Sequence, residues 1–437
     1  MLRRTFLALA IRRPSRVAPF EADITPPPGA PLCLGLVKPA GTVADPLRAR
    51  GVVLYPGRGR PIVLCALDWV AIGNGSQDQW KAALARAAGT EPVRVAVHTV
   101  HQHDAPGVDS SAATLLGMDG VLQSSAHARA SMARVAAAVR AARPRTLTHV
   151  SVGEARVDRV ASNRRILGAG GRVAFVRYTA CRDSPHCAAP EGVIDPMLKS
   201  IGFWDGAERV AGLCYYATHP MSHYGKGAVS ADFPGMARAS QEEFTVYFTG
   251  AAGNIGAGKY NDGAPETRKV LAGRLAAAMQ AARAAERRHP VDAIRWSAVS
   301  VRLPHREGSE FGEEAIVAAM RDTRSELKFR ANAARYLAWL RLTKAGRAIP
   351  VTCLHLGPAH VLHLPGELFV EYQLAAQKEA AEPVALAAYG DYGPMYIGTA
   401  KAYTEGGYET GPVSRVAPAV EEILLEAQRR VLRRTGS

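Results

Sequence analysis

Short apolar runs rich in β-branched residues recur along the chain, and longer stretches rich in Ala and Arg separate them. Runs of this length without a polar face are typical of strands buried on both sides of a sheet. The runs that predict strands cover residues 51–56, 62–68, 93–99, 172–179, 210–219, 244–250, 351–357, 360–366 and 383–390.

The intervening stretches place apolar residues at a spacing near 3.6 and are rich in Ala, Leu, Arg and Glu, which favour helices. The predicted helices cover residues 76–89, 124–143, 265–288, 311–346, 368–381 and 417–435. Because strands and helices follow one another in mixed order, we predict an α/β fold with a large mixed β-sheet core and flanking helices. The sequence shows no repeat and no low-complexity linker, so we expect a single domain over residues 20–437.

Composition adds limits on size and partners. With 437 residues, of which 48% are hydrophobic, the chain can bury a large core. Its net charge of +15 is spread along the chain without a sustained basic run or a nucleic-acid-binding motif. We therefore expect no nucleic-acid partner, although the positive field can attract an anionic substrate.

The N-terminal segment, residues 1–19, is basic and apolar and has the form of an export signal. Arg3 and Arg4 precede a short apolar stretch that Arg12 and Arg13 interrupt, which places it at the lower limit for a signal. A working signal would make the protein periplasmic or secreted, and a silent one would leave it cytoplasmic. No apolar stretch reaches the ~18 residues of a transmembrane helix, so we expect no transmembrane segment.

The six cysteines show no Cys-x-x-Cys spacing, which argues against a thiolate zinc site. Cys181 and Cys187 bracket a short loop. They form a disulfide if the protein is exported, or remain a reduced loop, which is the preferred interpretation.

Two strand ends carry histidines. In "VRVAVHTVHQHDAPG" the alternation of side chains along an extended segment turns His101 and His103 toward the same side. His98, earlier on the strand, is more typical of a packed histidine. In "LCYYATHPMSHYG" the proline after His219 fixes the histidine at the end of an apolar strand. Each motif also occurs in polar loops or as a buried, hydrogen-bonded histidine without a metal.

Two further segments follow strands. Glu367 comes after a Leu-Pro-Gly turn and before a predicted helix, where a carboxylate can also interact with the helix dipole. Residues 389–411 hold five tyrosines among six glycines, and long loops of this kind are usually functional. Its tyrosines Tyr396, Tyr403 and Tyr408 could equally anchor the loop by packing.

Together and in this order, the segments resemble the neutral/alkaline ceramidase family, zinc-dependent amidohydrolases that split ceramide into sphingosine and fatty acid. The resemblance spans about residues 20–430, the catalytic domain of that family, and leaves no room for its C-terminal immunoglobulin-like domain. The motifs that carry it are "HQHDAPG", "ATHPMSHYGKGAVSADFPG", "FTGAAGNIGAG", "LPGE" and "YIGTAKAYTEGGYE".

The resemblance implies one zinc ion per chain with His101, His219, Glu367 and Tyr396 as ligands. Zinc accepts these donors and lowers the pKa of a bound water to about 7. His103 would then line the site and transfer a proton or stabilise an oxyanion.

The same resemblance places Arg164 of "SNRRIL" in the active site. It also implies that Tyr403 and Tyr408 close over the substrate and stabilise charge on the carbonyl oxygen. Asp232 of "SADFPG" would orient a metal ligand from behind.

The sequence departs from the family at Asn254 and Gly256 of "GNIGAG", where the family has Asp and Ser, and at Asp104, where the family has Ser. Ceramide itself therefore becomes a doubtful substrate. We expect a zinc hydrolase that cleaves an amide bond in a small-molecule or lipid-like substrate. The alternatives are an esterase, an enzyme acting on a carbohydrate derivative, and a catalytically silent binding protein. The sequence leaves the oligomeric state open.

Overall fold

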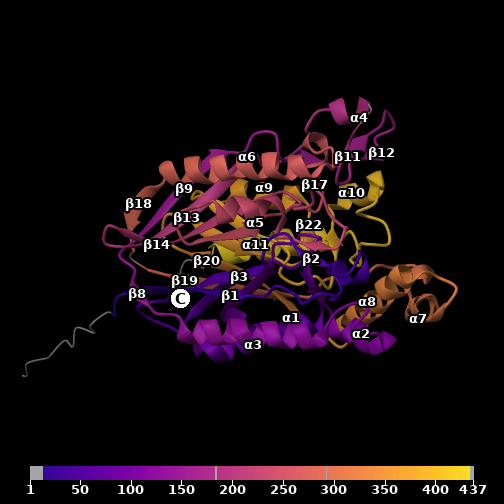
Figure 1. The fold of residues 1–437 in the computed structure, drawn as a ribbon, viewed down its shortest axis with the longest axis horizontal. Coiled ribbons are helices and arrows are strands. Elements are labelled where there is room, and N and C mark those ends of the chain that lie inside the picture. The colour runs from indigo at the N-terminus through magenta and orange to yellow at the C-terminus, as the bar shows by residue number, and fades with distance from the viewer. Residues whose placement is uncertain (1–12, 183–184, 292, 434–437) are drawn as a thin grey trace, which may run out of the picture.

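The structure is a computed structural model that describes residues 13–182, 185–291 and 293–433. Two β-sheets pack against each other, and helices cover their outer faces (Figure 1). A third sheet, from the C-terminal half, joins the same hydrophobic core. The predicted α/β class with a mixed sheet core and flanking helices is confirmed.

The first sheet has the order β6-β4-β3-β1-β8, with α1 and α3 on its outer face. Val52 and Leu54 join the core shared with the other sheets, whereas Val53 between them packs in the cluster beneath α1 and α3. This alternation is why the apolar run is continuous: both faces of the strand are buried. The elements are β1 (Arg16–Asp23), β3 (Arg48–Tyr55), β4 (Ile62–Leu67), β6 (Val95–Thr99), β8 (Arg145–Thr146), α1 (Gly75–Ala88) and α3 (Ser125–Ala141).

The second sheet has the order β16-β14-β13-β9-β18, and α6 packs across β9 and β13. The helix α5 lies between α6 and the edge strand β16. The elements are β9 (His149–Arg156), β13 (Met197–Asp205), β14 (Glu208–Tyr216), β16 (Thr245–Thr249), β18 (Arg287–Pro290), α5 (Asp232–Ala239) and α6 (Pro265–Ala284).

The third sheet has the order β19-β20-β21-β23 and is covered by α11, with α9 beside β23. Its elements are β19 (Arg295–Val301), β20 (Ile349–His355), β21 (His360–His363), β23 (Val384–Ala387), α9 (Val370–Glu379) and α11 (Val420–Arg433).

Short strand pairs and five further helices, of which α8 is long, make up the connections between the described sheets. The pairs are β2 (Thr42–Val43) with β15 (Ala228–Val229), β5 (Ala71–Ile72) with β7 (Gly107–Val108), β10 (Ser162–Asn163) with β17 (Ile255–Gly256), β11 (Arg165–Leu167) with β12 (Val173–Val176), and β22 (Glu367–Leu368) with β24 (Tyr396–Ile397). The helices are α2 (Ser110–Leu116), α4 (Pro185–Ala188), α7 (Glu313–Arg321), α8 (Leu327–Lys344) and α10 (Ala400–Glu405).

The helix predicted over residues 311–346 is two helices, α7 and α8. The chain leaves the helical path at Asp322, whose carboxylate accepts hydrogen bonds from the backbone N–H of Arg324 and the hydroxyl of Ser325. An aspartate side chain that accepts hydrogen bonds from the residues after it competes with the helical hydrogen bonds. At Asp322 this local turn replaces the helix. The uninterrupted apolar spacing hid this break.

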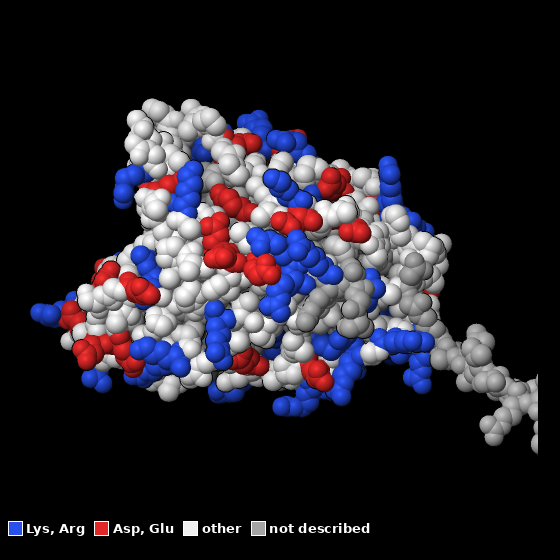
Figure 2. Space-filling view, turned by 180° about the vertical axis from the view of Figure 1, so that it is seen from behind, with Lys and Arg blue, Asp and Glu red and all other residues white. Residues whose placement is uncertain are grey.

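The structure also bears on the expectations for the N-terminal segment, the cysteine pair, membrane-spanning helices and surface charge. Residues 1–12 of the signal-like segment lie outside the described residues, and β1 already begins at Arg16. Cys181 and Cys187 form a disulfide rather than the preferred reduced loop. No described helix is long and apolar enough to cross a membrane. On the face in Figure 2, Lys and Arg are mixed with Asp and Glu.

The three sheets bring their parallel strands to one place. The parallel pairs β4/β6, β14/β16 and β21/β23 end there, and hydrogen bonds tie the ends together. Thr249 donates its hydroxyl to the carbonyl of Val100 at 2.8 Å, and its own carbonyl accepts the N–H of Ala388 at 3.0 Å. Loops after the carboxyl ends of parallel strands commonly hold ligands, so this junction positions the site.

Candidate metal centre

His101 enters the site from a sharp backbone turn. The strand β6 ends at Thr99, and His101 has a φ of 74°, so the extended segment predicted through His101 and His103 is wrong. Its N–H donates to the carbonyl of Trp69 at 2.9 Å, and its Nδ1 lies 2.6 Å from the carbonyl of Val70. With Nδ1 held as a donor, Nε2 keeps its lone pair for a metal.

His219 follows β14 and reaches the same point from the second sheet. Its backbone N–H donates to the carbonyl of Ile255, and its Nδ1 lies 3.1 Å from the carbonyl of Ala252. Burial holds the pKa of His219 well below its usual value, and the neighbouring His101 and Arg164 lower it further. The imidazole is therefore neutral, as a metal ligand must be.

Glu367 supplies a carboxylate between these two imidazoles. Its Oε2 lies 3.3 Å from Nε2 of His101 and 3.4 Å from Nε2 of His219. Neither this Oε2 nor Nε2 of His219 makes a hydrogen bond with any described residue, although both are buried. Two atoms that share a tetrahedral zinc ion are about 3.4 Å apart. The unpartnered atoms and their separations therefore fit a metal ion.

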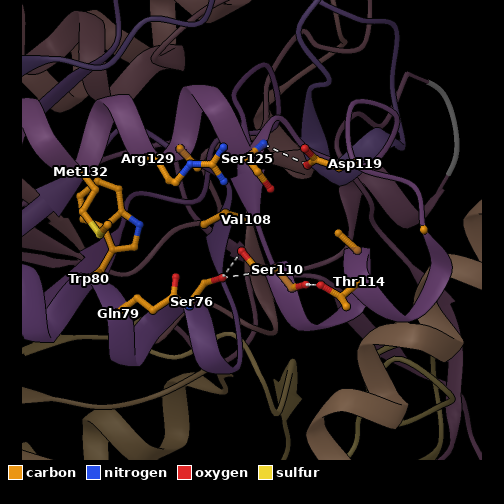
Figure 3. A pocket seen from close by; sticks show the side chains of 13 residues that line it. Ser76, Gln79, Trp80, Val108, Ser110, Thr114, Asp119, Ser125, Arg129 and Met132 are labelled. Carbon is orange, nitrogen blue, oxygen red and sulfur yellow. Dashed lines mark hydrogen bonds between the residues drawn. The ribbon is translucent and has the colours of Figure 1, made fainter.

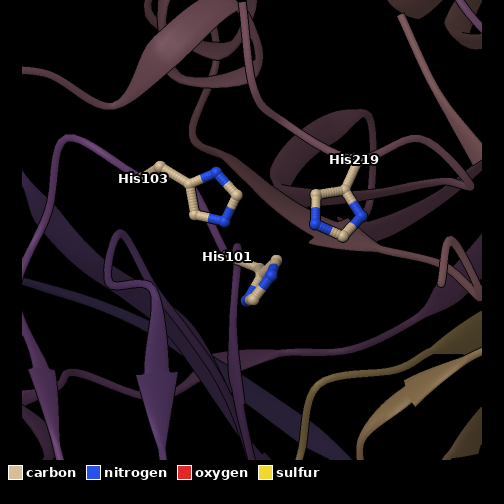
Figure 4. A group of neighbouring side chains, drawn as sticks. All are labelled: His101, His103 and His219. Carbon is tan, nitrogen blue, oxygen red and sulfur yellow. The ribbon is translucent and has the colours of Figure 1, made fainter. Parts of the chain in front are cut away.

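His103 completes a group of three histidines whose ligand atoms lie within 4.8 Å of one another. Its ring centre is 5.1 Å from that of His101 and 5.5 Å from that of His219 (Figure 4). Burial lowers the pKa of His103 well below its usual value, with His101 and Arg164 adding to the effect. The ring is thus neutral, which leaves it one nitrogen lone pair facing the cluster.

Tyr396 lies opposite Glu367 because β22 and β24 pair in parallel at these two residues. Arg164 donates from Nη2 to the Tyr396 hydroxyl at 3.3 Å and to a carboxylate oxygen of Glu409 at 3.1 Å. Burial raises the pKa of Tyr396 well above its usual value, whereas Arg164 acts to lower it. The structure therefore brings all four ligands implied by the resemblance into one cluster, with Arg164 behind the tyrosine.

A cavity of about 360 Å³ opens over this cluster. All three histidines, Glu367, Tyr396 and Arg164 line it, together with Tyr392 and Tyr408 and apolar side chains such as Leu36 and Met221. Tyr408 is 42% exposed and lies at the mouth, with its ring 5.7 Å from that of Tyr396.

Two of the predicted residues, Tyr403 and Asp232, hold the surrounding backbone. Tyr403 does not line the cavity, because its hydroxyl bonds Ser414 and the carbonyl of Val416. Asp232 accepts hydrogen bonds from the N–H and hydroxyl of Ser222, so it holds the loop after His219 instead of the imidazole.

Asn254 and Gly256 lie behind the ligands. Asn254 accepts the N–H of Val370 and donates to Glu371, which holds the start of α9 just after Glu367. A Cβ at Gly256 would lie 3.2 Å from Cδ of Arg164 and 3.8 Å from Cβ of His219. A serine at this position would therefore project beside Arg164 and His219, where this chain has no hydroxyl.

Sequence reasoning missed three contributors. The ring of Tyr389 stacks on His101 with centroids 4.5 Å apart, and Tyr392 lines the cavity beside Glu367. Glu409 is fully buried and pairs with both Arg164 and Arg165. The tyrosines belong to the loop that the sequence marked as functional, but only three-dimensional packing shows which of them face inward.

A larger hollow of about 600 Å³ lies elsewhere, between α1, α2 and α3 (Figure 3). Trp80, Ser110 and Arg129 are among its lining residues, and none of the residues predicted for the site lines it. The larger hollow therefore lacks the potential metal ligands. The smaller cavity is the candidate site because the histidines and Glu367 line it.

The comparisons with known proteins bear on the fold. No protein-family model matches the chain, and no curated protein matches its sequence. A solved ceramidase complexed with C2 matches with a TM-score of 0.68 and 16% identity, over 96% of this chain and 75% of that one. The neutral ceramidase from Pseudomonas aeruginosa matches with a TM-score of 0.68 and 17% identity, over 97% and 75%. The chain therefore has the fold of the neutral ceramidases.

Proposed function

We propose that the protein is a zinc-dependent hydrolase that cleaves an amide bond, working as a single catalytic domain. The observation that carries this proposal is the convergence of Nε2 of His101, Nε2 of His219 and Oε2 of Glu367, with Tyr396 opposite the glutamate. Three or four such donors at the base of a cavity are typical of catalytic zinc sites, which keep a position for water.

The metal would supply Lewis acidity and make a water molecule acidic enough to attack at neutral pH. The protein's own residues supply the rest. His103 lines the cavity and lies beside both histidine ligands, so it is placed where it would take the proton of the attacking water and return it to the leaving amine. Tyr408, at the mouth, donates its phenolic hydrogen to the carbonyl oxygen as charge develops there.

Arg164 acts through Tyr396. Its Nη2 already bonds the carbonyl of Gly253, the hydroxyl of Tyr396 and Glu409, which leaves it committed to holding the phenol in place. The guanidinium also favours the ionised phenol, the form that binds a metal. We therefore assign Arg164 a positioning role.

The substrate class follows from the cavity. The polar base, formed by the histidines and Glu367, lies below apolar walls that include Leu36, Val37 and Met395. This lining suits an N-acyl compound whose amide reaches the base and whose acyl part lies along the walls. Gly256 supplies no hydroxyl there, so we propose an amide of unspecified amine and not ceramide in particular.

The test combines metal analysis with a substrate screen on the full chain. We expect wild-type protein to hold one equivalent of zinc more than the His101→Ala variant and to hydrolyse some members of a series of N-acyl amides. His149→Ala, on β9, serves as the matched control and should keep both properties. Equal zinc content in wild type and His101→Ala would contradict the metal centre. Faster cleavage of matched esters than of every amide would make the protein an esterase, and zinc without any hydrolysis would indicate a binding protein.

A further inference from the structure

A second group of metal-binding side chains lies in the third sheet. Cys353 and His355 are two residues apart on β20 and so share one face of the sheet. His360 lies directly opposite His355 on the antiparallel neighbour β21. Their ligand atoms lie within 4.8 Å of one another, and all three residues are buried. Strand register thus brings one thiol and two imidazoles together.

Hydrogen bonds hold the far side of each ring. Nε2 of His360 lies 3.3 Å from a carboxylate oxygen of Glu382, and Nε2 of His355 lies 3.0 Å from the hydroxyl of Ser297. A second hydrogen bond joins His355 to the backbone of Val431 in α11, which covers this face. Metal-binding histidines usually have their other nitrogen held in this way, by a carboxylate, a hydroxyl or a backbone group.

On the near side, the two rings face each other through nitrogens whose protonation has to be assigned. Nδ1 of His355 and Nδ1 of His360 face each other at 3.1 Å. Because Nε2 of His360 must carry hydrogen to bond Glu382, its Nδ1 has a lone pair when the ring is neutral. That lone pair needs either a hydrogen on Nδ1 of His355 or a cation. The 3.1 Å separation is close to the spacing of about 3.3 Å between two nitrogens on one tetrahedral zinc ion.

Cys353 adds a donor that favours the cation. Its Sγ makes a long hydrogen bond of 3.8 Å to the carbonyl of Leu354 and another contact with the backbone of Val361, so no other side chain among the described residues holds it. Burial raises the pKa of this thiol, so it is inert as a free cysteine, but a coordinated metal removes the proton of a buried thiol outright. One sulfur with two imidazole nitrogens is a donor set that selects zinc among the common divalent metals.

We propose that Cys353, His355 and His360 form a second, structural zinc site that joins β20 to β21 beneath α11. This site is separate from the cavity, since none of its three residues lines it, and the proposal does not rest on the hydrolase function. The three donors are buried and lie away from the cavity, so an ion bound there would hold the two strands together and not meet a substrate. If the site instead holds no metal, His355 and His360 share a proton.

Cobalt substitution distinguishes these outcomes because only thiolate coordination gives Co²⁺ an intense near-ultraviolet charge-transfer band. The full-length protein is produced in minimal medium with cobalt. We expect the band in wild type and in His101→Ala, which keeps the second site. We expect the Cys353→Ser variant to lose the band completely and to bind one equivalent of cobalt less than wild type. Cys65→Ser, another buried cysteine in a strand, is the matched control and should keep the band.

A separate variant guards against misfolding. His360→Gln keeps the thiol and a polar side chain on β21, and it should also lose the band while circular dichroism shows a folded protein. Absence of the band from cobalt-loaded wild type would overturn the proposal. So would loss of the band in Cys33→Ser, because Cys33 lines the active-site cavity and would then be the coordinating thiol.

Discussion

The two histidine clusters use similar side chains in different surroundings. At the strand ends, backbone carbonyls of Val70 and Ala252 hold the two imidazoles, and a cavity of about 360 Å³ lies above them. On the face of the third sheet, side chains of Ser297 and Glu382 hold the rings, and α11 closes the space. The difference teaches that residue types alone do not distinguish the proposed catalytic centre from the proposed structural site, whereas access to a cavity does.

The largest expected effect compares the carboxylates of the two clusters. Replacing Glu367 by Ala removes the carboxylate that lies between His101 and His219. We expect activity to fall at least about 100-fold with loss of one zinc, more than the usual effect of losing an outer-shell partner. Glu382→Ala removes a half-exposed carboxylate from the other cluster and should leave activity within about twofold. Steady-state kinetics and metal analysis on both variants provide the measurement. Equal losses of activity would show that the clusters do not differ in function.

The next effect separates two adjacent arginines. Arg164 and Arg165 both pair with Glu409, but the hydrogen bond to Tyr396 comes from Arg164. We expect Arg164→Gln to weaken zinc binding about 10- to 100-fold, as for outer-shell partners of metal ligands. Arg165→Gln should have a smaller effect on zinc. Competition with a chromogenic chelator measures both affinities, and similar losses would mean that the shared ion pair, not Tyr396, carries the effect.

A smaller effect should appear when the pH is lowered in the presence of a chelator. Burial lowers the pKa of His355 to about 4 in the folded protein, below the unfolded value of about 6.5. The unfolded chain therefore binds more protons in this range, so the stability due to the neutral ring is present above pH 6.5 and is lost as the pH falls toward 4. Each such histidine contributes a slope of about 1.4 kcal/mol per pH unit. Denaturant unfolding from pH 7 to pH 4.5 measures the slope, which His355→Gln should reduce; an unchanged slope would rule out this contribution.

The smallest expected effect concerns the space at the first cluster. A Cβ at Gly256 would meet the flexible side chain of Arg164 at 3.2 Å, whereas one at Gly253 would lie 2.2 Å from the carbonyl oxygen of Glu367. Gly256→Ser should thus change the free energy of unfolding by less than about 1 kcal/mol, because reduced freedom of the unfolded chain offsets a mild clash. Gly253→Ala should destabilise the protein more. Thermal unfolding of the two variants compares them, and equal destabilisation would mean that the centre has no room for the serine hydroxyl.

The sequence predicted which residues form the first cluster better than it predicted the backbone conformation that brings them together. His101, His219 and Glu367 each follow an apolar run at a turn with Pro or Gly, and such punctuation is local, so it is readable without a structure. The extended path through His101 and His103 was wrong because the positive φ at His101 depends on contacts with Trp69 and Val70, which lie in another part of the chain.

The second cluster could not be predicted from spacing. The segments of Cys353, His355 and His360 were correctly predicted as strands, but their meeting depends on the register between β20 and β21. Similarly, the loop of residues 389–411 was recognised, yet the inward position of Tyr389 and the outward packing of Tyr403 follow from contacts with His101 and Ser414. Register and side-chain direction are long-range properties.

The tie between the three sheets has a consequence for the order of synthesis. His101 and His219 emerge early from the ribosome, whereas Glu367 and Tyr396 come from the last part of the chain. A nascent chain that has made the first two sheets therefore carries the imidazoles without the carboxylate or the phenol. Loading of the proposed zinc would therefore have to wait until β22 and β24 have been made, so metal occupancy would report that these late strands have joined the first two sheets.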